Sequence, residues 1–482
     1  MSQEIVLDET ITVPRTRDDC FAWVADFAHI EQWDPGVRSA TRLVEGPPRV
    51  GSEYRVNMKA GFALHYTVTE FEAPSRILMD VRSTLFDAIE EIRFDAVPEG
   101  TRIRYIARFH PRALLGLAAR AMPGMMDSVG KSAMRGLRRA LEDNFDARSD
   151  PAHHEACDRL VLPGMFRFTR FGYRGAKRRW PPMSARLTGR HILLTGATSG
   201  IGLACAHELA AMGADLTLVG RDRAKLDSVV TEVSRRTGNG SVRGEVADLS
   251  LMADVNALAD RLVAQGRTLH VLVNNAGALF NPRQETEEGL EKSFALLLLG
   301  PYILTERLHP LLADAGRARV VNVLSGGMYT QRIRVRDLQS TRGEYSGSVA
   351  YARAKRGLMI LTEEWADRWR EDGIVVNAMH PGWADTPGVE SALPAFRRLT
   401  RPLLRSPAEG ADTVVWLAGA TEAGKASGLF WLDREAHPTH LSARTRETPE
   451  DRAALLEALA AHARDERHAA ARGPAKARKT VA

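Results

Sequence analysis

Cysteine and long apolar runs are scarce in this sequence. The 482 residues include only 3 cysteines, Cys20, Cys157 and Cys205, and none of them belongs to a CxxC pair. So few thiols argue against a disulfide-stabilised scaffold and against a zinc site. The longest apolar stretch, residues 295–299, is far too short to cross a membrane, and the acidic N-terminus lacks the apolar centre of a secretion signal. We therefore expect a cytoplasmic protein with no metal site.

A large excess of one charge is also missing. The formal net charge is +6, and 44% hydrophobic with 26% charged residues is ordinary for a globular protein. The basic surplus gathers in residues 158–190. A patch that is so local does not predict a nucleic-acid-binding protein. The length exceeds one ordinary core, so we expect two domains.

Residues 1–146 show apolar residues with a period of two. The alternating positions are Tyr54, Val56 and Met58; Leu64, Tyr66 and Val68; Ile92, Phe94 and Ala96; and Ile103, Tyr105 and Ala107. This alternation predicts antiparallel strands with one face toward solvent. Residues 126–145 change to a helical period and predict a long amphipathic helix.

A curved sheet closed by one C-terminal helix resembles the α+β helix-grip fold of the START and polyketide-cyclase (SRPBCC) superfamily. That resemblance implies a domain that often encloses a hydrophobic ligand between sheet and helix. No residue in this part is diagnostic of chemistry. We expect His65 and His110 to be ordinary strand residues, because a lone strand histidine is usually a surface or satisfied residue.

Residues 147–186 form a predicted linker that contains a basic amphipathic helix at residues 160–180. This helix either contacts a membrane surface through its aromatic residues or packs between domains or subunits. Strand and helix patterns alternate over residues 187–462, which predicts an α/β, doubly wound parallel sheet. Residues 463–482 are rich in alanine, arginine and lysine and predict a disordered basic tail.

A strand, a glycine loop and a helix start follow one another at residues 191–212. The loop reads TGxxxGxG, with the candidate binding residues Thr195, Gly196, Ser199, Gly200, Ile201 and Gly202. The N-terminus of a helix presents unpaired N–H groups and its positive dipole end to a pyrophosphate. Glycines let the backbone turn sharply and approach that ligand closely. This order of elements predicts a dinucleotide-binding site.

The spacing of this loop resembles that of the short-chain dehydrogenase/reductase superfamily, which implies a Rossmann-type sheet and a nicotinamide dinucleotide. Further segments match the family in the expected order, including an NNAG segment and a proline–glycine loop on the nicotinamide side. Their candidate cofactor residues are Asp248, Leu249, Asn275, Ala276, Gly277, Pro381, Gly382 and Thr386.

The end of the second strand of this domain bears on the choice of cofactor. An NAD enzyme usually has a carboxylate there for the ribose hydroxyls, but this chain has Gly220 followed by Arg221. A guanidinium suits a 2′-phosphate in both geometry and charge. The sequence favours NADP(H) over NAD(H), and the alternative is that Arg221 is a solvated arginine that stacks on adenine.

Tyr351 and Lys355 carry the YxxxK spacing, so they share one face of a helix. The family resemblance implies that Lys355 binds the nicotinamide ribose. We expect the neighbouring ammonium, helped by an oxidised nicotinamide ring, to favour the phenolate of Tyr351 and to make it a general acid/base. Ser325, at a strand end, is predicted to hydrogen-bond the same substrate oxygen.

One position departs from the family pattern. The family often has an asparagine that bends a helix through a water molecule and extends a proton relay from the lysine. This sequence has Leu297 there, and leucine cannot hydrogen-bond. Either another group completes the relay or turnover is slow. We expect the substitution Leu297→Asn to leave the fold intact and not to reduce the rate.

Several stretches resemble the retinol-dehydrogenase-like branch of the family, which implies a reductase or alcohol dehydrogenase of no specific substrate. They are residues 289–292, 325–328, 337–339, 379–389, 409–413 and 439–441. Residues 383–404 contain several apolar side chains, which predict either a substrate lid or simple packing on the sheet. They are Trp383, Val389, Leu393, Phe396, Leu399, Leu403 and Leu404.

The leading hypothesis is an NADP(H)-dependent oxidoreductase that acts on a hydrophobic small molecule. The rival is a non-enzymatic ligand carrier or cofactor sensor, with Leu297 as a sign of lost catalysis. Members of the family are often dimers or tetramers, so a homo-oligomer is an alternative that the sequence does not decide.

Overall fold

The computed structural model divides the chain into two compact units. The first comprises Met1–Asn144 and Arg178–Ser184, and the second comprises Phe145–Lys177 and Ala185–Ala482. The structure describes residues 5–44, 46–112, 122–141, 149–152, 158, 166–178, 180, 183, 185–386, 397–398 and 400–472. Cys157, most of residues 147–165 and the centre of the predicted lid, residues 387–396, lie outside the described residues.

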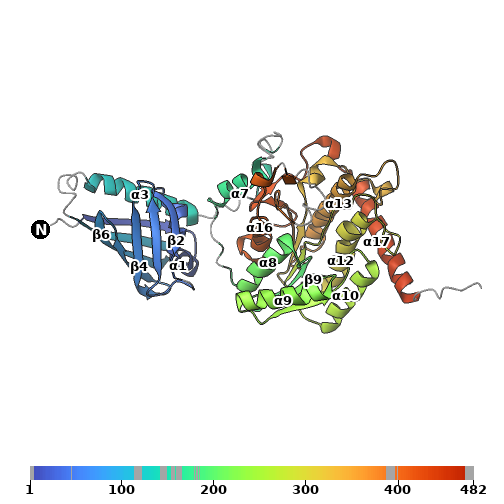
Figure 1. Cartoon of the computed structure of the whole chain (residues 1–482), viewed down its shortest axis with the longest axis horizontal. Coiled ribbons are helices and arrows are strands. Elements are labelled where there is room, and N and C mark those ends of the chain that lie inside the picture. The colour runs from blue at the N-terminus through green and yellow to red at the C-terminus, as the bar shows by residue number, and fades with distance from the viewer. Residues whose placement is uncertain are drawn as a thin grey trace, which may run out of the picture. The chain divides into compact units, whose positions relative to one another are not determined.

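The first unit is a seven-stranded antiparallel sheet with a long helix at its end (Figure 1). Its elements are β1 Ile5–Val13, α1 Arg17–Val24, η1 Phe27–His29, α2 Ile30–Trp33, β2 Val37–Arg42, β3 Glu53–Met58, β4 Ala63–Glu72, β5 Arg76–Arg82, β6 Phe86–Val97, β7 Gly100–Pro111 and α3 Met122–Leu141. The strand order is β1-β7-β6-β5-β4-β3-β2. The predicted alternation and the helix-grip architecture are both confirmed, although α3 begins and ends four residues before the range 126–145.

The core of this unit lies between the concave face of the sheet and its helices. Leu137 and Leu141 of α3 are fully buried, together with Trp33, Phe27 and Tyr54. Gly136 packs so closely on the Trp33 carbonyl oxygen that a Cβ at this position would clash. Burial of this many aromatic groups holds α3 against the sheet, because apolar area removed from water stabilises roughly in proportion to its size.

One carboxyl group lies within this apolar core. Glu90 of β6 accepts hydrogen bonds from the Tyr105 hydroxyl and, at 3.3 Å, from the Tyr66 hydroxyl. Burial raises the pKa of Glu90 to about 7, and the two phenol hydrogen bonds only partly oppose this shift. Sequence reasoning found no acid/base group in this domain and missed Glu90. The signal was available, since Ala88, Glu90, Ile92 and Phe94 alternate on one face of β6.

The second unit contains the doubly wound sheet. Its elements before the sheet's midpoint are α7 Arg170–Lys177, β8 His191–Thr195, α8 Gly200–Ala211, β9 Asp215–Gly220, α9 Arg223–Thr237, β10 Val242–Val246, α10 Met252–Gln265, β11 Val271–Asn274, α11 Lys292–Phe294, η4 Ala295–Leu299 and α12 Gly300–Ala313. Those that follow are β12 Arg319–Val323, η5 Gly326–Thr330, η6 Val335–Asp337, α13 Gly347–Arg368, β13 Val375–Met379, η7 Arg401–Leu403, α16 Pro407–Gly419, η8 Glu422–Lys425, β14 Phe430–Leu432, β15 Glu435–His437, η9 Ala443–Thr445 and α17 Pro449–Arg472.

The strand order of this sheet is β10-β9-β8-β11-β12-β13-β14-β15, in which only β15 runs antiparallel to its neighbour. Helices α8, α9 and α16 cover one face, and α10, α12 and α13 cover the other (Figure 1). Chain order reverses between β8 and β11, which is where ligands bind at the carboxyl ends of strands in open α/β sheets. The predicted Rossmann-type fold is therefore confirmed.

Two segments differ from expectation in extent. Helix α17 continues to Arg472, so it includes residues 463–472 of the predicted basic tail. Alanine and arginine dominate this stretch, and both favour the helix. Within the predicted basic helix at 160–180, the described helix is α7, whose Tyr173 and Ala176 are buried. The Tyr173 hydroxyl donates to Asp412 of α16 at 3.2 Å.

We predict that Glu90→Gln stabilises the first unit at alkaline pH. The raised pKa means that the folded state binds a proton which the unfolded chain has released, so stability falls as the pH rises from about 4.5 through about 7. Glutamine cannot ionise and escapes this loss. Calorimetry of the full chain should show a higher unfolding midpoint for the variant at pH 8 and a much smaller gain at pH 4.

Glu91→Gln is the matched control on the neighbouring residue. Glu91 accepts hydrogen bonds from Arg76 at 2.6 Å and Arg93 at 2.8 Å, and these partners hold its pKa below its ordinary value despite the opposing effect of burial. Its loss should destabilise the protein at pH 8 and matter least at low pH. Equal effects of Glu90→Gln at both pH values would contradict the prediction.

Candidate active site

Four parallel strands bring the predicted site residues to one edge of the sheet. Strands β8, β11, β12 and β13 end at Thr195, Asn274, Val323 and Met379, and the loops that carry the candidate residues follow directly. Parallel strands share one carboxyl edge, so segments far apart in sequence meet there. The glycine loop, the NNAG segment, Ser325 and the Pro381–Gly382 loop are thereby brought together.

The glycine loop is tied to the NNAG segment by hydrogen bonds. The Thr195 hydroxyl accepts from the backbone N–H groups of Asn275 at 2.9 Å and Ala276 at 3.0 Å. The Asn275 amide donates to the carbonyl oxygens of Thr195 at 2.9 Å and Gly196 at 3.1 Å. These hydrogen bonds of Thr195 and Asn275 thus fix the shape of the glycine loop.

This loop has the form that a pyrophosphate requires. Gly196 and Gly200 have φ of 65° and 54°, and a Cβ on Gly202 would clash with the Gly196 carbonyl. Ser199 is the N-cap of α8 but makes no side-chain cap hydrogen bond, so the first N–H groups of this 12-residue helix have no such partner. An anion at this helix end would satisfy them, so these residues fit a dinucleotide.

The predicted adenine side lies along β9 and the loop after β10. Thr198 of the glycine loop packs on Gly220, within 2.7 Å of where a Cβ would be. The next residue, Arg221, has an exposed side chain with no partner in the described part of the chain. Asp248 is held by Ser250, whose N–H and hydroxyl donate to it at 2.9 and 2.7 Å. Leu249 is buried beside it.

The three predicted catalytic side chains meet at the end of β12. Lys355 is buried, and its Nζ donates to the Val323 carbonyl oxygen at 2.7 Å and lies 5.8 Å from the centre of the Tyr351 ring. Burial lowers the pKa of Lys355 to about 7. Ser325, two residues after Val323, accepts from the Gly327 N–H at 3.2 Å and lies near enough to Tyr351 to lower its pKa.

The pKa of Tyr351 differs from the sequence expectation. Burial raises this pKa, and the hydrogen bond from Ser325 opposes the rise without overcoming it. The expected lowering by the lysine ammonium is therefore wrong for the protein by itself, because the same burial favours the neutral amine of Lys355. The phenol is held protonated, which is the form that can donate a proton.

The remaining predicted residues lie on the Pro381–Gly382 side. Gly382 has φ of 73° and is buried against the Arg405 guanidinium, so close that a Cβ would clash. Pro381 and Thr386 are half-buried. Gly277 lies opposite, where a Cβ would be 3.8 Å from the Lys355 Nζ. The structure thus brings the predicted residues to the same edge of the sheet.

Comparison with known proteins agrees with this geometry. Residues 190–395 match the family model of short chain dehydrogenases, and residues 4–142 match that of "Polyketide cyclase / dehydrase and lipid transport" proteins. The chain is 41% identical over 300 residues to "Dehydrogenase/reductase SDR family member 12" of Bos taurus, and the match covers 61% of this chain and 94% of that protein. The chain belongs to the short-chain dehydrogenase/reductase family. It is therefore a dehydrogenase/reductase of the kind that uses a nicotinamide dinucleotide.

Two other relatives indicate the branch. Human "Retinol dehydrogenase 12" is 34% identical over 269 residues, which cover 55% of this chain and 85% of the relative. A "Putative daunorubicin C-13 ketoreductase" of Streptomyces is 36% identical over 253 residues, which cover 52% of this chain and 86% of the relative. These matches confirm that this short-chain dehydrogenase/reductase lies in the retinol-dehydrogenase-like branch.

Leu297 lies near Lys355, the predicted catalytic lysine. It is fully buried in η4, a π-helical turn that joins α11 to α12. A Cβ on Gly277 would lie 3.2 Å from a Leu297 methyl group and 3.8 Å from the Lys355 Nζ. The turn is present without the asparagine that the family often has there. Gly300 at its end packs on the Leu249 carbonyl oxygen, within 2.7 Å of where a Cβ would be.

Sequence reasoning missed three residues at this edge, which are His380, Arg405 and Phe168. His380 is buried between β13 and Pro381, and burial lowers its pKa to about 3. Arg405 is buried in an ion pair with Asp433 at 2.5 Å. A histidine directly before the proline–glycine loop was a usable signal for His380. No local signal marks Arg405 or Phe168, because their contacts are formed only in the folded protein.

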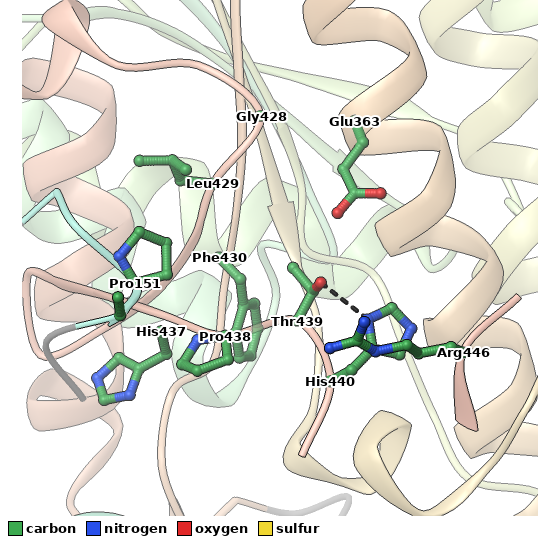
Figure 2. Close-up of a pocket in the computed structure, with 11 residues that line it drawn as sticks. Pro151, Glu363, Gly428, Leu429, Phe430, His437, Pro438, Thr439, His440 and Arg446 are labelled. Carbon is green, nitrogen blue, oxygen red and sulfur yellow. Dashed lines mark hydrogen bonds between the residues drawn. The ribbon is translucent and has the colours of Figure 1, made fainter. Parts of the chain in front are cut away.

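A separate cavity of about 340 Å³ lies beside α13 and the β14–β15 hairpin (Figure 2). Its polar lining residues are Glu363, His437, Thr439, His440 and Arg446. Glu363 is already paired with Arg452 at 2.6 Å, and His440 is paired with Glu447 at 2.9 Å. None of the predicted site residues lines this cavity, so it is not part of the candidate site.

In the described part of the chain, no helix combines the length and apolar character needed to span a membrane. No group of three or more histidine, cysteine, aspartate or glutamate side chains there is arranged to hold a metal ion.

We predict that Leu297→Asn lowers stability but not turnover per folded molecule. The change removes buried apolar area and buries an amide, which costs on the order of 2–4 kcal/mol. The amide would lie beside Lys355, where it can accept a hydrogen bond from the ammonium. Thermal unfolding and active-site-normalised kinetics measure the two effects. Leu297→Ala is the control, because it removes the bulk without adding an amide. A turnover of the asparagine variant below that of the alanine variant would contradict the idea.

Proposed function

We propose that this protein is an NADP(H)-dependent oxidoreductase that interconverts a carbonyl group and an alcohol on an apolar substrate. The observation that carries the proposal is the meeting of Tyr351, Ser325 and Lys355 beside the glycine loop at one edge of the sheet. Tyr351 is the general acid/base, Ser325 a hydrogen-bond donor to the substrate oxygen, and Lys355 the residue that faces the cofactor ribose.

The proposed cofactor residues divide into three groups along the edge. The glycine loop supplies Thr195, Gly196, Ser199, Gly200, Ile201 and Gly202 for the pyrophosphate. The adenosine half is met by Arg221, Asp248 and Leu249. The nicotinamide half is met by Asn275, Ala276, Gly277, Tyr351, Lys355, Pro381, Gly382 and Thr386. When bound there, the nicotinamide supplies or accepts the hydride.

The protein's own residues handle the proton. In the reducing direction the protonated phenol of Tyr351 donates to the carbonyl oxygen, and the hydroxyl of Ser325 stabilises the charge that develops there. Burial keeps this phenol protonated until the proton is needed. Lys355 is kept in place by the Val323 carbonyl oxygen, and its pKa of about 7 lets it gain or release a proton near neutral pH.

The surroundings of Arg221 support the preference for NADP(H). Its guanidinium is exposed, directly after β9, and Thr198 of the glycine loop packs on the adjacent Gly220. The nearest following carboxylate, Asp222, is the N-cap of α9 and accepts from the Lys225 N–H at 3.0 Å. Arginine is thus available for a 2′-phosphate, while the acidic group that NAD would need is engaged elsewhere.

The proposed substrate is apolar. The relatives are named for retinol, a polyprenol and daunorubicin, all of which present large apolar surfaces. Of the predicted lid, Trp383, Leu403 and Leu404 lie among the described residues, and Leu403 is 37% exposed. We propose that the helix-grip unit binds a hydrophobic compound. We also propose that the protein is cytoplasmic and forms a homo-oligomer.

We predict that Tyr351→Phe lowers turnover by about 10²–10⁴-fold, because the proton donor is lost while the ring remains. Stopped-flow or steady-state oxidation of NADPH with a panel of hydrophobic ketones measures this loss, and fluorescence titration should show a far smaller change in NADPH affinity. Tyr302→Phe, which alters a tyrosine stacked on Trp365 away from the strand ends, is the control and should keep full activity.

The same panel separates the enzyme from a ligand carrier. The specific observation that favours a carrier is the apolar Leu297 beside Lys355. Binding of NADPH and ketone without turnover in the wild-type protein would favour the carrier and refute the enzyme.

We predict that Arg221→Asp shifts the cofactor preference toward NADH. The new carboxylate repels a 2′-phosphate and can accept from the ribose hydroxyls of NADH. The ratio of kcat/KM for NADPH over NADH should fall by at least about tenfold, roughly the value of one charge-assisted hydrogen bond. Arg235→Asp, at the exposed C-terminal end of α9, is the charge-matched control. An unchanged ratio in Arg221→Asp would refute the assignment.

We further propose that residues 160–180 contact a membrane surface. Phe166 and Phe171 are 57% and 49% exposed, and Arg167, Arg170 and Arg174 are close to them in sequence. Full-length protein should sediment with anionic vesicles and not with neutral ones. The double variant Phe166→Ser, Phe171→Ser should lose this binding, whereas Leu43→Ser, at an exposed apolar residue of the first unit, should keep it. Failure of the wild-type protein to sediment would remove this proposal.

A further inference from the structure

The segment that precedes the Rossmann sheet is fixed to the loop after β13. The Trp383 N–H donates to the Phe168 carbonyl oxygen at 2.8 Å. The Nε of Arg405 donates to the carbonyl oxygens of Phe168 at 3.1 Å and Thr169 at 3.2 Å. Arg405 is itself 1% exposed and is held by a two-point ion pair with Asp433, at 2.5 and 2.8 Å. Buried, charge-assisted contacts of this kind are geometrically strict.

The side chain of Phe168 lies against the residues next to the catalytic serine. Its ring is 4.6 Å from that of His380 and tilted by 57°, and it is 6.1 Å from that of Trp383. Gly326, which directly follows Ser325, faces both rings. A Cβ on this glycine would lie 2.8 Å from the His380 Nε2 and 3.3 Å from a Phe168 ring carbon. The backbone at Gly326 is therefore pressed against these two rings.

His380 is fixed on its other side by the proline–glycine loop. Its Nδ1 accepts from the Gly382 N–H at 3.1 Å, so Nε2 carries the proton of the neutral ring. Nε2 has no hydrogen-bond partner among the described residues, although His380 is only 4% exposed. A buried imidazole N–H without an acceptor lowers the free energy of unfolding. On its Nε2 side, between Gly326 and Phe168, the ring is therefore held by packing.

We propose that Phe168 is a positioning residue for the reaction. Through its contacts with His380 and Gly326 it holds the Ser325 hydroxyl at the distance that Tyr351 and the substrate oxygen require. The segment before the sheet is then a working part of the active site as well as a connection. This inference rests on the proposed function for its catalytic consequence, but its structural consequence can be measured separately.

Removal of the Phe168 ring should loosen the serine loop and leave the backbone contacts in place. The carbonyl oxygens that bind Trp383 and Arg405 belong to the main chain, so Phe168→Ala retains them. Gly326 has no side chain of its own to fill the space. A displacement of Ser325 by about 1 Å is enough to cost up to about 10²-fold in rate.

Hydrogen exchange of the full-length protein without cofactor tests the structural part. The Gly327 N–H donates to the Ser325 hydroxyl at 3.2 Å, and the Met328 N–H donates to the Ser325 carbonyl oxygen at 3.1 Å. In Phe168→Ala the peptides that contain these two amides should exchange at least about tenfold faster, with β8 and β11 unchanged. Phe171→Ala, at a 49% exposed phenylalanine of the same segment, should exchange like the wild type.

Kinetics test the catalytic part. Phe168→Ala should lower kcat by about tenfold or more, with NADPH affinity within twofold of the wild type. The pKa in the pH profile of kcat should rise, as it should in Ser325→Ala, because the serine hydrogen bond lowers the pKa of Tyr351. Phe168→Leu should restore most of the rate, since it refills the space with another apolar group.

The outcomes are separable. Unchanged exchange at Gly327 and Met328 in Phe168→Ala overturns the inference whatever the activity. A loss of kcat without a shift in the pH profile, or with an equal loss of NADPH affinity, overturns it in favour of a merely structural role. Faster exchange together with full activity in Tyr351→Phe leaves the positioning of the loop intact but refutes the proposed function.

Discussion

The hydrogen bond from the Lys355 Nζ to the Val323 carbonyl oxygen is the contact on which the site depends. It joins the middle of α13 to the end of β12 at 2.7 Å in a buried position. Tyr351 lies one helical turn before this lysine, and Ser325 follows Val323 by two residues, so one contact sets the distance between phenol and hydroxyl. No carboxylate in the described part of the chain pairs with the ammonium, which leaves its charge available to a ligand.

The absence of a paired carboxylate has a cost in protonation. Burial favours the uncharged forms of both Lys355 and Tyr351, which is the ordinary effect of removing charge from water. Both groups therefore favour their neutral forms and are not locked as an ion pair. A ligand of fixed charge beside them would shift both pKa values. The fold therefore fixes the positions of Tyr351 and Lys355, whereas a bound ligand would set their charges.

The sequence predicted those parts of the fold and of the site that local spacing determines. TGxxxGxG and YxxxK each act within one turn or one loop, so their residues are found where the spacing indicates. The alternation in residues 54–107 predicted strands for the same reason. Glu90 was missed because one polar residue on an apolar face has no local signature of its partners, Tyr66 and Tyr105, which come from other strands. The contacts of Phe168 with Trp383 and Arg405 join residues that are even farther apart in sequence, so no local pattern could predict them.

The π turn at residues 295–299 has a consequence for how this family can change. An extra residue within a helical turn shifts everything that follows by about 100°, so it is difficult to gain or lose in small steps. Here the shift is kept by the backbone and by the close approach of Gly300 to Leu249, with leucine where the family often has a polar group. The side chain near Lys355 can thus change, at a cost in stability, while the helix keeps its course. Chemistry at this point can be altered by single substitutions, without a rebuilding of the scaffold around it.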